Sequence, residues 1–146
     1  MVPLNLPQFK CNIRKNDGKY EIFDVIRKKY VALTPEEWVR QHFVHFLIKD
    51  LGYPRSLVSV ESGTRYHQLK KRTDIVVYDR NMAPLLLAEC KSFKLKLNQS
   101  GMDQASLYNR SLQAKYLVVT NGIQHFCCEF NNGSYTFLDR IPMFEE

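Results

Sequence analysis

The chain has 146 residues, of which 45% are hydrophobic and 25% are charged, and its formal net charge is +6. This length allows a single domain with its own hydrophobic core, over residues 1–146, and excludes a multi-domain motor or helicase. The composition excludes a disordered, collagen-like or coiled-coil chain. The surplus of positive charge favours a polyanionic partner such as nucleic acid, although many ordinary proteins share it.

The four cysteines have neither the spacing of a zinc site nor that of a disulfide framework, because none forms a C-x-x-C pair. The first ten residues contain no long apolar run, and the longest such run, Met82 to Ala88, is too short to cross a bilayer. We therefore expect a reduced, cytoplasmic protein that has no membrane partner.

The N-terminal stretch predicts a β-hairpin. Two strand-like runs, over residues 9–14 and 20–25, flank an Asp17-Gly18 turn. Residues 28–33 continue the strand pattern.

A helix is expected next. Thr34 can cap it, Pro35 suits the first helical position, and Glu37 completes a capping box with Thr34. The helix should run to about Leu51, with Gly52 at the position after its end. Four apolar residues at helical spacing mark the face expected to be buried: Val39, Phe43, Phe46 and Leu47.

The rest of the chain alternates between strand-like and helical segments. Residues 73–78 and 84–91 flank a short turn and should form an antiparallel hairpin. The full order is strands at 57–61, 73–78 and 84–91, a helix from about 100 to 113, a strand at 115–120, and a hairpin of 124–130 with 134–138. This order predicts an α/β fold in which helices flank a mixed central sheet, with additional hairpins at both ends of the chain.

One group of charged residues points to chemistry. Asp74 opens an apolar strand, and Glu89, Cys90 and Lys91 end the next one. Side chains alternate along a strand, so Glu89 and Lys91 should share a face while Cys90 points into the core. The hairpin should bring Asp74 near them. Two carboxylates, a backbone carbonyl and waters suit Mg²⁺, which can activate a water at a phosphodiester, and a lysine beside them can assist that water.

A purely structural interpretation stays open for these residues. Glu89 and Lys91 can form an ion pair at the end of a buried strand, while Asp74 merely begins its own strand. An isolated D…E-x-K pattern is short and common, so the pattern alone does not decide between the two interpretations.

The sequence resembles the PD-(D/E)xK nucleases, and more closely the N-terminal nuclease domain of type I restriction enzyme R (HsdR-type) subunits. The similar pieces are VALTPEEWVRQ from Val31, the LGY at 51–53, RTDIVVYD from Arg72, LLLAECK from Leu85 and YLVVTNG ending at Gly122. The resemblance implies a restriction-endonuclease-like α-β-β-β-α-β core, over about residues 34–122, and a Mg²⁺-dependent DNA endonuclease, with Mn²⁺ as an expected substitute. Thr73 stands where the family signature has proline, which is not a metal ligand.

The resemblance also assigns roles to particular residues. Asp74 and Glu89 would hold the metal, Lys91 would assist the water, and a glutamate of the first helix would approach the metal. Both Glu36 and Glu37 qualify. Glu37 already has a capping role, whereas Glu36 lies three residues before Val39 and seven before Phe43, so its helical phase is closer to the buried face and favours it. Gln104 and Tyr108 make a Q-x-x-x-Y pattern on one helix face, with Gln104 supporting the site and Tyr108 the DNA backbone.

Basic residues flank the expected site on both sides and would bind phosphates: Lys70, Lys71, Arg72, Lys94 and Lys96. Ordinary solvated loops are the alternative. The expected partners are DNA and either a second copy or a larger restriction or defence complex. The chain has no G-x-x-x-x-G-K-[ST] motif, which is the phosphate-binding loop of ATP-driven enzymes. We therefore do not expect this chain by itself to couple restriction to ATP-driven translocation. A non-catalytic nucleic-acid-binding or assembly module that keeps the fold is the alternative function.

Overall fold

The computed structural model describes residues 1–61 and 74–145, with Glu61 and Asp74 described by their backbone alone. The strands and helices follow one another in the order β1 (Ile13–Asn16), β2 (Lys19–Asp24), β3 (Lys29–Ala32), α1 (Pro35–His45), β4 (Val58–Glu61), β5 (Asp74–Tyr78), β6 (Pro84–Cys90), α2 (Gln99–Leu112), β7 (Tyr116–Thr120), β8 (His125–Asn131) and β9 (Ser134–Leu138). Two short helical turns, η1 (Phe46–Asp50) and η2 (Arg55–Leu57), lie between α1 and β4.

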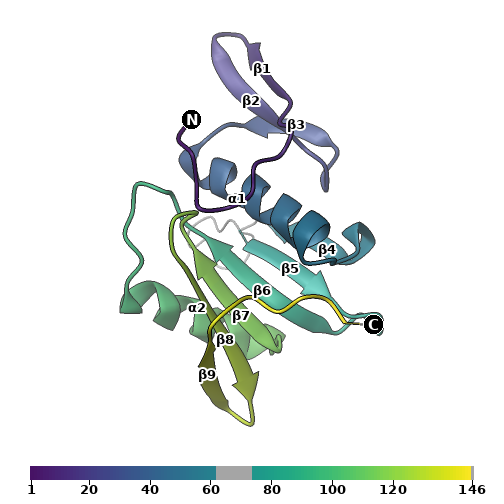
Figure 1. Cartoon of the computed structure of the whole chain (residues 1–146), viewed down its shortest axis with the longest axis vertical. Coiled ribbons are helices and arrows are strands. Elements are labelled where there is room, and N and C mark those ends of the chain that lie inside the picture. The colour runs from purple at the N-terminus through teal and green to yellow at the C-terminus, as the bar shows by residue number, and fades with distance from the viewer. Residues whose placement is uncertain (62–73, 146) are drawn as a thin grey trace.

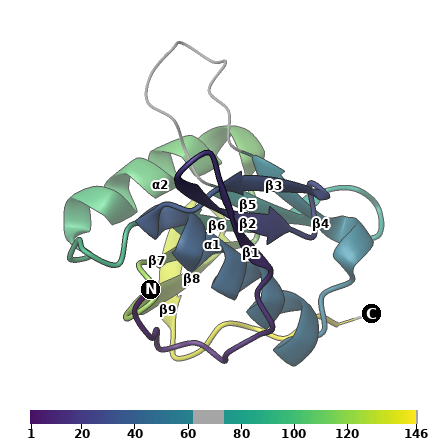
Figure 2. The same cartoon turned by 90° about the horizontal axis from the view of Figure 1, so that it is seen from above.

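The strands form two sheets on either side of α1 (Figure 1). The larger sheet has six strands in the order β4-β5-β6-β7-β8-β9, and it is mixed because β6 and β7 run parallel while the other neighbours are antiparallel. The smaller sheet, β1-β2-β3, lies beyond α1, and α2 covers the opposite face of the large sheet (Figures 1 and 2). The predicted mixed sheet with flanking helices is thus confirmed. The two C-terminal strands extend the sheet instead of standing apart from it.

Local signals placed most of these elements correctly. Asp17 and Gly18 both have positive φ, at 54° and 81°, as a tight hairpin turn requires. The Thr34 hydroxyl accepts a hydrogen bond from the Glu37 backbone N–H at 3.0 Å, which confirms the predicted cap. The helix continues past His45 as the π-helical turn η1, and Gly52 follows with φ of 80°.

The alternation of side chains along β6 divides the core into two parts. Ala88 and Cys90 belong to the cluster on the α1 face, together with Val39 and Phe43. Leu87 belongs to the cluster on the α2 face. Because side chains alternate along a strand, Glu89 follows Leu87 onto the α2 face. Among the residues that the structure describes, no helix is long and apolar enough to span a membrane.

Candidate active site

An ion pair at the end of β6 forms the centre of the candidate site. Lys91 Nζ lies 3.1 Å from Glu89 Oε2, so the two side chains predicted to share a face do meet. Glu89 is only 7% exposed, whereas Cys90 between them is 2% exposed and points into the core. A nearly buried carboxylate needs a cationic partner, and Lys91 supplies one here.

The backbone register brings Asp74 to the same place. Asp74 in β5 is paired directly with Glu89 in β6, and Glu61 in β4 is paired with Asp74. Three acidic residues therefore occupy one row across three neighbouring strands. Sequence reasoning missed Glu61. The sequence did offer a signal for Glu61, because it ends its predicted strand just as Asp74 begins the next one.

The loop after β6 is fixed to the end of the neighbouring strand. The Lys91 backbone N–H donates to the Thr120 carbonyl at 2.8 Å, which extends the β6–β7 pairing by one residue. The Asn121 side-chain amide donates to the Leu95 carbonyl at 2.7 Å, and its oxygen accepts from two N–H groups in the following turn. Asn121 therefore holds both segments that leave this end of the sheet. Sequence reasoning assigned Asn121 no role at the site.

Helix α2 begins beside the ion pair. The Asn98 side chain caps it by accepting from the Gly101 N–H at 3.0 Å. A Cβ atom at Gly101 would lie 3.6 Å from Lys91 Cε, so the first turn of α2 packs against the lysine stem. Gln104 and Tyr108 follow Gly101 at three and seven residues, and so share its face of the helix. Gln104 is exposed, and Tyr108 is partly buried against the α2-side core.

The first half of α1 lies at the same end of the large sheet but on its other face. A Cβ at Gly122, just beyond β7, would come within 3.1 Å of Val39 Cγ2. The first half of α1 therefore lies near the strand ends that carry the site, as both views show (Figures 1 and 2). Among the described contacts, none joins Glu36 or Glu37 to the Glu89–Lys91 pair.

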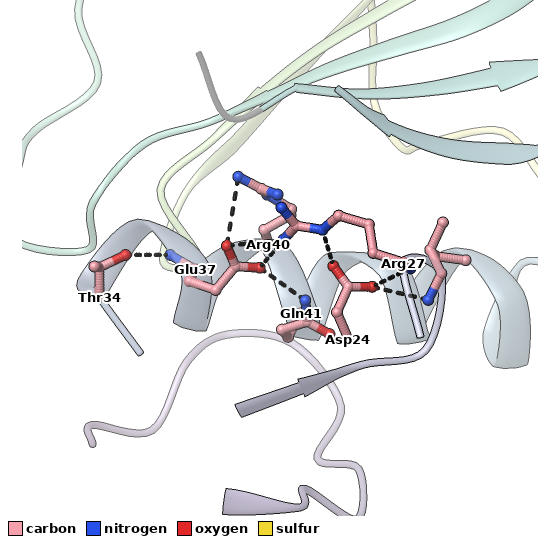
Figure 3. A network of polar contacts seen from close by, with 7 residues as sticks. Asp24, Arg27, Thr34, Glu37, Arg40 and Gln41 are labelled. Carbon is pink, nitrogen blue, oxygen red and sulfur yellow. Dashed lines mark hydrogen bonds and ion pairs between the residues drawn. The ribbon is translucent and has the colours of Figure 1, made fainter. Parts of the chain in front are cut away.

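Glu37 belongs to a polar network of its own (Figure 3). Its carboxylate accepts hydrogen bonds from Arg27 Nη2 at 3.2 Å and from Gln41 Nε2 at 2.7 Å, and it lies 3.5 Å from Arg40 Nη2. Arg27 Nε also donates to Asp24 at 2.6 Å. This network connects the β2–β3 turn to α1.

The charges of the network are balanced inside it. Burial alone would raise the pKa of Asp24, but hydrogen bonds from the Arg27 side chain and from the Arg27 and Ile26 N–H groups outweigh it, so the pKa is lowered. Arg40 is 2% exposed, and its Nε and Nη1 atoms have no hydrogen-bond partner within the described residues. Glu37 thus compensates the charges of two arginines, so its carboxylate is poorly suited to bind a metal ion as well.

Helical phase placed Glu36 closer to the buried face than Glu37, and this was wrong, whereas the choice of the glutamate that approaches a metal stays a prediction. Glu37 is buried and Glu36 only partly so. Phase is a poor guide here because the small sheet and the N-terminal segment cover the face of α1 that turns away from the large sheet. A polar residue such as His42, which contacts Phe9 of the N-terminal segment, is therefore buried too.

The expected DNA-contacting residues divide into two groups. Lys94 and Lys96, in the loop between β6 and α2, are exposed. Lys70, Lys71 and Arg72 lie outside the described residues. Within the described side chains, which do not include those of Glu61 and Asp74, no three His, Cys, Asp or Glu side chains gather closely enough to hold a metal ion.

A family model described as "Type I restriction enzyme R protein N terminus (HSDR_N)" matches residues 35–142, which is most of the chain. The chain belongs to this family. No curated protein and no solved structure gives a significant match.

The match places the boundaries of the HSDR_N domain on the fold. It begins with α1 and ends beyond β9, so the six-stranded sheet, both helices and every described residue of the candidate site lie within it. The small sheet β1–β3 precedes the HSDR_N match. Membership confirms the resemblance seen in the segments from Val31 to Gly122.

Proposed function

We propose that this HSDR_N domain is a divalent-metal-dependent DNA endonuclease of the PD-(D/E)xK type, acting in restriction or defence. The observation that carries the proposal is the placement of the three signature residues. Asp74 is in register with Glu89, and Glu89 contacts Lys91 at 3.1 Å, all at one end of the central sheet. The element order α1-β4-β5-β6-α2-β7 supports a restriction-endonuclease-like core.

The chemistry of the donors fits a hard divalent cation. Asp74 and Glu89 provide carboxylate oxygens, which Mg²⁺ and Mn²⁺ prefer, and Glu61 adds a third acidic position in the same row. When bound, the metal supplies an activated water and stabilises charge on the phosphate. Glu36, whose carboxylate is free of the Glu37 network, is the α1 residue that we propose at the edge of this site.

The protein groups around the carboxylates have separate tasks. Lys91 forms an ion pair with Glu89, and its ammonium group can orient the attacking water or stabilise the developing phosphate charge. The first turn of α2 beside Lys91 contains no acidic residue, so its N–H groups favour a phosphate there. Gln104 on the same helix face would support the site or the DNA backbone, and Lys94 and Lys96 would hold flanking phosphates.

Plasmid cleavage tests the proposal. Supercoiled DNA would be incubated with the protein in Mg²⁺, Mn²⁺ or EDTA, in parallel with Asp74→Ala, Lys91→Ala and the control Lys49→Ala, an exposed lysine outside the site. We expect nicking or linearisation that requires metal, and that falls at least about a hundredfold in both site variants, as is typical for the loss of a catalytic group.

A negative cleavage result still has a defined meaning. Mn²⁺ titration by calorimetry would then show whether the wild type binds metal and Asp74→Ala does not. Such binding without cleavage would favour the assembly-module alternative, in which the site awaits a partner. Absence of metal binding by the wild type would rule out the proposed metal centre.

A further inference from the structure

The loop between β6 and α2, residues 91–98, begins and ends at the candidate site. Lys91 opens it directly after β6 and contacts Glu89 at 3.1 Å. Asn98 closes it and caps α2. The first turn of α2 then returns to the start of the loop, because a Cβ atom at Gly101 would lie 3.6 Å from Lys91 Cε. Compact surface loops whose ends meet in this way often carry function.

Backbone hydrogen bonds fix the middle of this loop. The Ser92 hydroxyl accepts from the Lys94 N–H at 3.0 Å, and the Ser92 carbonyl accepts from the Leu95 N–H at 3.1 Å. The Leu95 carbonyl in turn accepts from the Asn121 side-chain amide at 2.7 Å, which ties the loop to the turn after β7. The residues around Leu95 therefore keep a defined position beside the site.

Three consecutive side chains of the loop stay outside the core. Phe93 packs against the core cluster on the α1 face, and Leu97 packs against the cluster on the α2 face. Between these two anchors Lys94, Leu95 and Lys96 are exposed, with Leu95 at 55%. Neither lysine belongs to an ion pair within the described residues. A single exposed leucine is ordinary, but here it lies between two unpaired cations on a fixed loop at the site.

The spacing of the two lysines fits the narrower groove of a DNA duplex. Their Cα atoms are at most about 7 Å apart, because two residues of extended chain span no more. The minor groove is about 6 Å wide, whereas the major groove is about 12 Å wide. Lys94 and Lys96 can thus reach phosphates on the two sides of a minor groove, with Leu95 between them over its floor.

We propose that Leu95 contacts the floor of the DNA minor groove, between phosphates held by Lys94 and Lys96. The choice of DNA rests on the proposed nuclease function. Leucine is among the apolar side chains that proteins insert into this groove. Guanine adds an N2 amino group to the floor, and a leucine placed there would cost that group its hydrogen bond to water. Leu95 therefore makes A·T-rich duplex the preferred substrate.

Binding measured without cleavage tests this contact. The anisotropy of labelled duplexes would be followed in EDTA, and the duplexes would differ only in their central base pairs, which are A·T, G·C or inosine·C. Inosine lacks the N2 amino group, so inosine·C combines the minor groove of A·T with the major groove of G·C. The three duplexes therefore separate a minor-groove contact from a major-groove one.

The wild type would be compared with Leu95→Ala and with the matched control Leu107→Ala. Leu107 is 59% exposed, and on α2 it lies about 120° around the helix from Gly101, which packs on Lys91. Lys94→Gln and Lys96→Gln would test the phosphate contacts. Urea unfolding midpoints would verify that all four variants fold.

We expect the wild type to bind the A·T and inosine·C duplexes at least about fivefold more tightly than the G·C duplex. Leu95→Ala should lose this preference but keep the slope of log K against log salt, because it removes no charge. Leu107→Ala should keep both. Each lysine variant should reduce the slope by about 1.

Four results would overturn the proposal. The first is a wild type that binds no duplex, and the second is a wild type that binds inosine·C no better than G·C. The third is an A·T preference that survives in Leu95→Ala or is lost equally in Leu107→Ala. The fourth is a salt slope that neither lysine variant changes.

The experiment separates this proposal from the nuclease proposal. If the preference depends on Leu95 in EDTA while the wild type cleaves nothing in Mg²⁺ or Mn²⁺, the groove contact stands and the nuclease assignment falls. If cleavage occurs but the preference does not depend on Leu95, the reverse holds.

Discussion

His45 shows how a single side chain responds to the layered structure. Its ring stacks on Phe9 at a centroid distance of 4.0 Å, which places it under the N-terminal segment. Burial, reinforced by the nearby positive charges of Lys49 and Arg55, lowers its pKa to about 4. His45 is therefore neutral at physiological pH and acts as a packing residue.

This shift predicts a loss of stability in mild acid. In the unfolded chain the histidine titrates near 6.5, so as the pH falls below that value the unfolded state takes up a proton first. The stabilisation is complete above pH 6.5 and declines as the pH falls to about 4. Between pH 7 and pH 4.5, the free energy of unfolding should decrease less for His45→Gln than for the wild type. Urea unfolding at both pH values would measure the two decreases. An NMR titration that places the His45 pKa near 6.5 in the folded protein would contradict the stacked, buried ring.

At the residue scale, Glu89 and Lys91 were predictable because strand alternation is a strict rule over two residues. Their contact at 3.1 Å follows from it directly. The role of Asn121 was not predictable, because its bond to Leu95 joins two segments that are 26 residues apart.

At the scale of elements, the Arg27–Glu37 contact connects the small sheet to α1. Glu37→Gln would remove the negative charge that compensates the positive charges of Arg27 and Arg40 in a largely buried environment. We expect the free energy of unfolding to fall by about 3 kcal/mol, as when one partner of a buried ion pair is removed.

The adjacent glutamate provides the control for this change. Glu36→Gln alters a partly buried neighbour outside the network, and should change the free energy of unfolding by less than about 0.5 kcal/mol. Urea unfolding of both variants makes the comparison. Equal losses in the two variants would show that the network contributes no specific stabilisation.

At the scale of the whole molecule, α1 is buried from both sides. The Trp38 indole N–H donates to the Val2 carbonyl at 2.8 Å, and Phe9 packs edge-on against His42. The N-terminal segment and the small sheet therefore complete the core around the helix, although they lie outside the HSDR_N match.

Removal of residues 1–33 should consequently prevent cooperative folding, even though the whole family match remains. The deletion removes Val2 and Phe9 and so exposes the outer face of α1, which includes Trp38 and His42, and such a surface favours aggregation. Size-exclusion chromatography and urea unfolding would test this. A matched insertion of two glycines after Gly18, in an exposed turn, should fold normally. A soluble deletion variant with a sharp unfolding transition would show that the HSDR_N domain is stable without the small sheet.

The sequence by itself determined the order and nature of the elements, because capping residues, positive-φ turns and apolar periodicity act over a few residues. It also predicted that Asp74 lies near Glu89, because a hairpin brings the two strands together, whereas the exact register, with its shift between Val77 and Tyr78, was not predicted. Tertiary structure alone decided which α1 glutamate is buried, because both faces of that helix are covered by distant segments. It likewise decided that the C-terminal hairpin joins the large sheet and that the small sheet lies on α1, since these contacts depend on long-range packing and not on local pattern.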